Sequence, residues 1–223
     1  MSAAASKNLA EVRWRDYVMA RGDGFDTFWR EHGGEQGRRL LFIVGRGFDP
    51  RAPLGLRRVT AAAPGCAINV VALEFRDELA NDTAEQRLAA EANGRAFEMA
   101  VGGRGTLTSK AVNFRNEKRD SIAARSAANL FADESTIGPY TDVVIDISAM
   151  PRVVYFPLIS RLLFFHDALE CAGKPAPNVH VIVSEDPSLD MLIREHGIDE
   201  EASYLHPFEG PFNREAKGGQ PTV

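Results

Sequence analysis

The chain has 223 residues, of which 44% are hydrophobic, and carries a formal net charge of -5 at pH 7. This composition excludes a disordered chain and suits one globular core, while the negative charge argues against a nucleic-acid partner. No apolar run reaches the roughly 20 residues of a membrane-spanning helix, and Cys66 and Cys171 alone provide no disulfide framework, so we expect a cytoplasmic protein without a membrane partner.

Residues 1–38 are expected to form an N-terminal helical collar. Apolar side chains from Leu9 to Met19 follow a helical pattern. Phe25, Phe28 and Trp29 then recur at helical spacing in a second helix. We interpret these aromatic side chains as packing on the edge of a sheet rather than as an aromatic ligand-binding box.

The most informative stretch begins with a buried strand at residues 39–45. The strand continues into a loop with the sequence Gly45, Arg46, Gly47, Phe48, Asp49, Pro50 and Arg51. Glycines let backbone N–H groups approach an anion closely, and the two arginines offer positive charge to phosphate. In this interpretation Asp49 accepts hydrogen bonds from ligand hydroxyl groups. The loop therefore predicts a site for a nucleotide-like ligand.

The next predicted strand, at residues 67–75, carries an acidic side chain near its carboxyl end. A carboxylate at this position bonds the ribose hydroxyl groups in dinucleotide-binding folds, so Glu74 is a candidate ligand-binding residue. The alternative is an ordinary solvated charge at the end of a strand.

The middle of the chain predicts a capped helix from Asp82 to Ala100, a short strand at residues 110–114 and a second helix at residues 117–132. Basic side chains around this second helix form a strip that acidic residues interrupt. Such a strip is typical of a solvated helix face, and we expect no nucleic-acid surface there.

The last third of the chain repeats the order of strand, loop and helix. A β-branched strand at residues 142–147 leads to a polar loop and to Pro151, which starts a strongly apolar helix that reaches Cys171. We expect this helix to be buried on most sides or to cover a partner. A strand at residues 179–184 and a helix from Ser188 to about His196 follow.

Residues 201–223 predict an irregular C-terminal tail, because prolines and glycines punctuate them. A sheet built from strands near residues 40, 70, 145 and 180 usually continues. The hypothesis is therefore that the chain is the first half of a longer protein or a shortened variant.

Alternating strands and helices predict an α/β domain over residues 39–200, Rossmann-like, with a mostly parallel sheet flanked by helices. The loops after its strands meet at one edge of the sheet, where ligands bind in such folds. The candidate ligand-binding residues at this edge are Gly45, Arg46, Gly47, Phe48, Arg51, Glu74, Ser148 and Arg152. Asp146 and Asp49 are the candidate catalytic residues, because a carboxylate can stabilise a cationic sugar or activate water.

Established motifs are absent from the sequence. Pro50 stands where the dinucleotide fingerprint has its third glycine, and no lysine follows as in a phosphate-binding P-loop. Ser148 lacks the Gly-x-Ser-x-Gly setting of a hydrolase nucleophile. The five histidines have no short metal-binding spacing, so no metal site is expected, and His166 and His180 are interpreted as core histidines.

The stretches Ile43 to Asp49 and Ile145 to Arg152 resemble the first and middle binding loops of Rossmann-like domains from bacterial antiviral operons. Those domains include nucleotide-messenger sensors and NAD-cleaving domains. The resemblance covers the alternation of elements across residues 39–196 and implies NAD or another nucleotide as the ligand. Neither stretch matches an established signature, so no catalytic residue is transferred from that group.

Three functions remain open from the sequence. The first is binding of a nucleotide or NAD-like ligand, with Arg46 and Arg51 or Arg152 on phosphate and Asp49 or Glu74 on ribose. The second is hydrolysis of such a ligand at its N-glycosidic bond. The third is a non-catalytic scaffold, in which the helix at residues 151–171 docks a second copy of the chain or an operon partner.

Overall fold

The computed structural model describes residues 17–77 and 82–190. Its strands are β1 (Arg39–Gly45), β2 (Ala67–Arg76), β3 (Leu107–Asn113), β4 (Asp142–Asp146) and β5 (Asn178–Ile182). Its helices are α2 (Asp23–Gly34), α3 (Leu54–Ala62), α4 (Ala84–Val101), α5 (Ala123–Ala128), the 3-10 helix η1 (Glu134–Thr136), α6 (Arg152–Cys171) and α7 (Pro187–Asp190).

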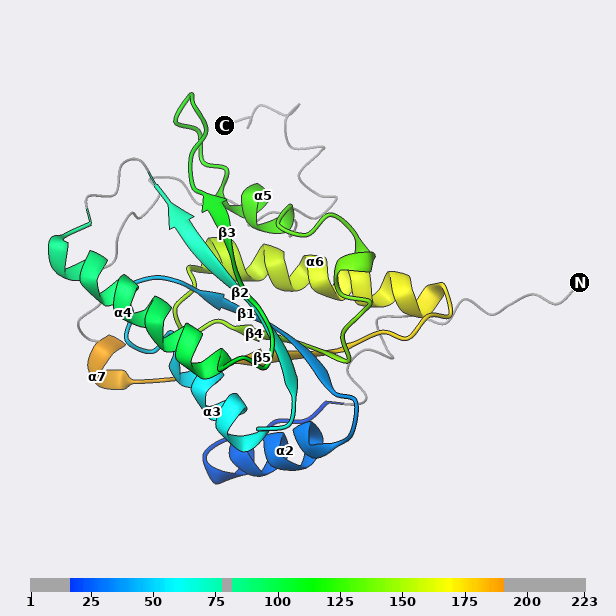
Figure 1. Cartoon of the computed structure of the whole chain (residues 1–223). Helices are drawn as coiled ribbons and strands as arrows, with labels where there is room; N and C mark the ends of the chain where they lie inside the picture. Colours follow the sequence, from blue (N-terminus) through cyan, green and yellow to red (C-terminus); the bar gives the residue numbers. More distant parts are fainter. Residues whose placement is uncertain (1–16, 78–81, 191–223) are drawn as a thin grey trace, which may run out of the picture.

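The strands form a single sheet in the order β3-β2-β1-β4-β5 (Figure 1). Every neighbouring pair in this sheet is parallel. Parallel strands need crossover connections, and helices supply most of these between successive strands. The predicted α/β, Rossmann-like sheet is confirmed.

Apolar runs in the sequence become strands because both faces of the sheet are covered. In β1, Leu40, Phe42 and Val44 enter one hydrophobic core, and the alternate residues Leu41 and Ile43 enter the other. The same alternation in β2 and β4 builds both cores. Burial on both sides explains why these strands read as continuous apolar runs.

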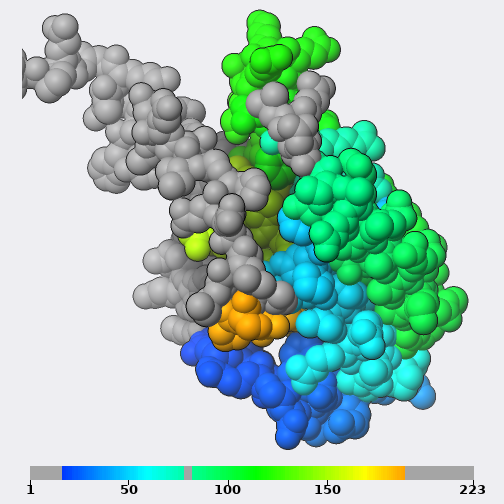
Figure 2. Space-filling view, turned by 90° about the vertical axis from the view of Figure 1, so that its left-hand side faces the viewer, coloured from blue at the N-terminus to red at the C-terminus, as the bar shows by residue number. Residues whose placement is uncertain are grey.

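The helices lie in two layers, one on each face of the sheet (Figure 1). α2, α3 and α4 cover the first face, and Figure 2 shows them adjoining one another along one side of the molecule. α5, η1 and α6 lie on the second face. Trp29 of α2 is 1% exposed in the first core, so its interpretation as a packing residue is confirmed.

The predicted helix at residues 117–132 is wrong for most of its length. Only α5 is helical there, and the preceding segment is a turn closed by a bridge between Arg115 and Ser121. The Oδ1 atom of Asn116 accepts hydrogen bonds from the backbone N–H groups of Lys118 and Asp120, at 2.9 Å each. Such side-chain bonds compete with the helical ladder, and no apolar residue in this segment compensates by burial.

The strongly apolar helix α6 packs Val154, Leu158, Leu162, Phe165 and Leu169 into the second core. Phe164 is 60% exposed on its other side. The helix is therefore buried along its sheet face, and a partner over its outer face stays a prediction.

Several expected elements fall on residues outside the described ranges. This applies to most of the first predicted helix, whose described end at Tyr17 to Met19 is not helical. It also applies to the continuation of the helix that starts as α7, and to the C-terminal tail at residues 201–223. None of the helices that the structure describes combines the length and hydropathy needed to cross a bilayer.

Candidate functional site

β1 and β4 are neighbours in the sheet, but the chain leaves them toward opposite faces. α3 follows β1 onto the first face, and α6 follows β4 onto the second. In open parallel sheets, ligands bind outside the carboxyl ends of the strands at such a topological switch point. We call the two loops at this point, residues 46–53 and 147–151, the switch-point site.

The end of β1 lies close against the second loop of the switch-point site. A Cβ atom on Gly45 would lie 2.6 Å from the backbone oxygen of Ala149 and 3.0 Å from the Phe75 ring. Only a residue without a side chain leaves room for this approach. Gly45 therefore lets the end of β1 approach the loop after β4, and its predicted role in binding an anion stays a prediction.

Asp146 ends β4 and is fully buried. Its Oδ1 atom accepts hydrogen bonds from the backbone N–H of Ser148, at 3.0 Å, and from the Ser148 hydroxyl group. Ser148 Oγ in turn accepts a hydrogen bond of 2.8 Å from the backbone N–H of Ser184. The loops after β4 and β5 are thus tied together through one carboxylate.

The second oxygen of Asp146 has an unusual environment. Oδ2 is buried and has no hydrogen-bond partner among the described residues. Burial raises the pKa of Asp146 to about 6, against the lowering effect of the Ser148 bonds and with a smaller raising effect from the charge of Asp49. The carboxyl therefore titrates close to neutral pH, in the range suited to general acid or base chemistry.

Asp146 also lies against the first turn of α3. A Cβ atom on Gly55, the second residue of this helix, would overlap Asp146 Oδ2. The amino end of a helix favours negative charge, and a carboxylate already lies beside this one. An incoming phosphate would meet that carboxylate, so the start of α3 is a poor place for an anion.

Asp49 and Arg51 pair with each other inside the first loop. Asp49 Oδ2 accepts a hydrogen bond of 2.7 Å from Arg51 Nη2, and Oδ1 accepts one of 3.0 Å from Nε. Asn93 of α4 donates through Nδ2 to the backbone oxygens of Gly47 and Asp49, at 2.8 Å each. The loop conformation is therefore fixed by its own ion pair and by one amide from a neighbouring helix.

Arg46 and Glu74 also pair, across β1 and β2. Arg46 Nη1 donates to Glu74 Oε1 at 3.0 Å, and Arg76 lies 3.6 Å from the other Glu74 oxygen. Gly94 of α4 makes room for the guanidinium group, because a Cβ atom there would lie 3.0 Å from Arg46 Nη2. The structure thus brings these two predicted ligand-binding residues together as an ion pair.

Phe48 and Arg152 are the predicted residues that face solvent. The Phe48 side chain is 49% exposed in the first loop. Arg152 is exposed as the first residue of α6, and its side chain makes no hydrogen bond or ion pair with any residue that the structure describes. The backbone oxygen of Pro151 accepts hydrogen bonds from the N–H groups of Val154 and Tyr155, so only the N–H groups that precede Val154 in this helix still need acceptors.

Sequence reasoning missed Asn93, Gly55 and Gly94, which shape the switch-point site from helices. A polar residue beside a glycine inside an otherwise ordinary helix is a weak signal, and it could have indicated a contact with a loop. Reasoning also missed a second group, His32, Asp142 and His180, at the opposite end of β4. Those three residues are far apart in the sequence and carry no spacing signal.

The comparisons with known proteins add no family. No family model matches the chain, and no curated protein is significantly similar to it. The function is therefore argued from the geometry of the chain itself.

Proposed function

We propose that this protein binds a nucleotide or NAD-like ligand at the switch-point site. The observation that carries the proposal is the topology: β1 and β4 are adjacent, and their two loops and the start of α6 converge at the carboxyl edge of a parallel sheet. This is the position at which Rossmann-like sheets bind ligands.

In this proposal Arg152 binds the phosphate of the ligand. Arg46 and Arg51 already bind Glu74 and Asp49, so their charge is largely neutralised. Arg152 stands at the amino end of a 20-residue helix, where N–H groups and the helix dipole both favour an anion. Ser148 lies in the same loop and offers a hydroxyl group.

The organic part of the ligand has matching surfaces in the first loop. Phe48 presents an exposed ring on which a base can stack. The carboxylates of Asp49 and Glu74 are partly exposed beside their arginine partners. They keep acceptor positions for ribose hydroxyl groups, because a carboxylate has about four lone-pair sites.

Calorimetric titration with a panel of mononucleotides, dinucleotides, cyclic nucleotides and NAD tests the proposal. We expect one class to bind, and Arg152→Gln to weaken that binding by about tenfold or more, because a charged hydrogen bond to phosphate is lost. Arg125→Gln, which removes an exposed arginine on α5, is the matched control and should bind as the wild type does. Absence of heat and of any thermal stabilisation with every nucleotide would overturn the proposal.

Hydrolysis of the same ligand is the second candidate, and the pKa of Asp146 near 6 is the observation that favours it. The burial of Asp146 argues for the binding function first, because a catalytic carboxyl must reach the ligand. Turnover of NAD or a nucleotide by the wild type, with loss of turnover in Asp146→Asn and retained binding, would establish the hydrolase. An intact ligand after prolonged incubation with the wild type would leave binding alone.

A further inference from the structure

A group of possible metal ligands lies at the amino end of β4, away from the switch-point site. The Nε2 atoms of His32 and His180 lie 2.7 Å and 2.9 Å from the same oxygen, Oδ1 of Asp142. The three ligand atoms are all within 4.8 Å of one another. They come from α2, β4 and β5, so the tertiary fold alone brings them together.

The number of donors on Asp142 exceeds what its carboxylate accepts comfortably. Oδ1 faces both imidazoles and also the amide of Asn178, at 3.1 Å. Oδ2 accepts from the Thr141 hydroxyl at 2.7 Å and lies 3.4 Å from Arg38 Nη1. Five donors thus compete for about four lone-pair sites. One cation in place of the two imidazole protons relieves this competition, since each Nε2 then contributes a lone pair.

The surroundings hold the three side chains in a fixed orientation. The rings of Phe28 and His32 stack, with centroids 5.0 Å apart and 13° between their planes. The centroids of the Trp29 and His180 rings lie 5.1 Å apart. Asp142 accepts hydrogen bonds from the Thr141 hydroxyl and the Asn178 amide in addition to those from the two imidazoles. Its carboxylate is therefore oriented by neighbouring side chains, as metal-binding carboxylates are.

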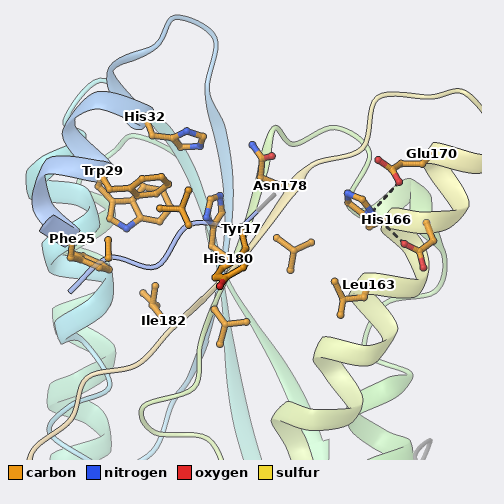
Figure 3. A pocket seen from close by; sticks show the side chains of 16 residues that line it. Tyr17, Phe25, Trp29, His32, Leu163, His166, Glu170, Asn178, His180 and Ile182 are labelled. Carbon is orange, nitrogen blue, oxygen red and sulfur yellow. Dashed lines mark ion pairs between the residues drawn. The ribbon is translucent and has the colours of Figure 1, made fainter. Parts of the chain in front are cut away.

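The histidines of this group line a pocket of about 590 Å³. Figure 3 shows His32, Asn178 and His180 on one wall and His166 and Glu170 across the pocket on α6. His32 and His180 are only 15% and 17% exposed, whereas Asp142 is fully enclosed behind them. A cation can thus enter from the pocket, and a coordination position facing the pocket stays accessible to water or to a small molecule.

We propose that His32 Nε2, His180 Nε2 and Asp142 Oδ1 bind a divalent first-row transition metal ion, with at least one coordination position open to this pocket. Two imidazoles and one carboxylate suit zinc and iron(II) in particular. Ligand atoms around such ions lie about 2.0–2.2 Å from the metal. The two nitrogens, now 2.7 Å and 2.9 Å from the carboxylate oxygen, must move apart from it to admit the ion.

The test uses tag-free protein stripped with a chelator and titrated with Zn2+ or Co2+ alone. We expect one ion per chain, thermal stabilisation on binding, and a visible Co2+ absorption band that Zn2+ displaces. His32→Gln and His180→Gln should each weaken binding by at least about tenfold. His166→Gln, which removes a histidine on the opposite wall of the same pocket, is the matched control and should bind as the wild type does.

The wild type also provides a readout that needs no variant. Addition of Zn2+ should shift the imidazole NMR signals of His32 and His180 and leave those of His166 unchanged. The proposal is overturned if stripped wild-type protein takes up no ion, or if His166→Gln is the variant that loses binding. Equal binding by His32→Gln, His180→Gln and the wild type would also overturn it.

Discussion

At the scale of single residues, Asp146 connects the switch-point site to the pH of the solution. Its carboxyl is buried, one oxygen has no hydrogen-bond partner within residues 17–77 and 82–190, and burial raises its pKa from 3.8 to about 6. The folded protein therefore keeps this proton over a pH range in which the unfolded chain has already lost it.

The raised pKa of Asp146 makes the free energy of unfolding depend on pH. Below pH 3.8 the carboxyl is mostly protonated in both the folded and the unfolded protein. Between pH 3.8 and about pH 6 mostly the folded protein keeps the proton. The contribution of Asp146 to the free energy of unfolding therefore falls as the pH rises through this range. Asp146→Asn removes the titration and keeps an acceptor for Ser148. We expect the unfolding free energy of the variant, relative to the wild type, to rise by on the order of 2–3 kcal/mol between pH 4 and pH 7.

Urea unfolding of both proteins at several pH values measures this difference. Asp133→Asn is the control: hydrogen bonds from Ser135 lower the pKa of Asp133 below its ordinary 3.8, so its contribution to stability is lost only below about pH 4 and its offset from the wild type should stay nearly constant between pH 4 and pH 7. An offset between Asp146→Asn and the wild type that stays constant from pH 4 to pH 7 would contradict the assigned environment of Asp146.

Gly55 tests the contact between Asp146 and α3 in a second way. A Cβ atom at this position overlaps Asp146 Oδ2, so we expect Gly55→Ala to destabilise the protein by about 1–3 kcal/mol. Gly24 is the second residue of α2, and a Cβ atom there meets no atom of the described part of the chain within 4 Å. Gly24→Ala should therefore be neutral or stabilising by up to about 1 kcal/mol. Equal thermal midpoints for the two variants would show that the first turn of α3 is not packed as described.

At the scale of elements, α4 acts on the switch-point site from outside the two loops that form it. Its buried Asn93 holds the loop after β1 through two backbone oxygens, and Gly94 admits the Arg46 side chain. The helix starts at a capping box formed by Thr83 and Gln86 and ends at Gly102 in the left-handed region, with φ at 52°. These fixed ends set the position of Asn93 along the loop.

Removal of the Asn93 amide should loosen this loop. Asn93→Ala leaves two backbone oxygens without their donor, so we expect a loss of about 1–3 kcal/mol in the unfolding free energy and faster amide exchange at residues 46–53. Glu91→Ala, on the exposed side of the same helix, should change neither quantity appreciably. Unchanged exchange in the loop of Asn93→Ala would contradict the role of α4.

At the scale of the whole molecule, β4 separates two sites of different chemistry. Asp142 and Asp146 stand at its two ends, about 13 Å apart for a strand of this length. Val144 between them enters the first core, so the two carboxylates share that face of the sheet. The proposed nucleotide and the proposed metal ion therefore occupy opposite ends of one strand and can be tested independently.

The sequence was sufficient for the order of the elements, because β1, β2 and β4 are apolar runs bounded by loop residues. The sequence did not show which side chains pair with each other. Arg46 meets Glu74 only through the register that aligns Gly45 with Leu73. Periodicity contains no information about such register, so the predicted roles of both residues on a ligand stay predictions.

The histidine group shows the same limit over a longer range. His32 and Asp142 are 110 positions apart, and His180 lies 38 positions beyond Asp142. Metal-binding patterns can be recognised in a sequence when the ligands lie close together on one element. Here three separate elements supply one ligand each.

The measurement that tests the switch-point site most directly is hydrogen–deuterium exchange with and without the nucleotide that binds most tightly in calorimetry. Binding at the switch-point site should slow amide exchange in residues 46–53 and 147–154. Exchange in residues 25–32 and 178–182, beside the pocket that His32 and His180 line, should stay unchanged. Protection confined to the pocket residues, or no protection with any nucleotide at saturating concentration, would contradict a ligand site between β1 and β4.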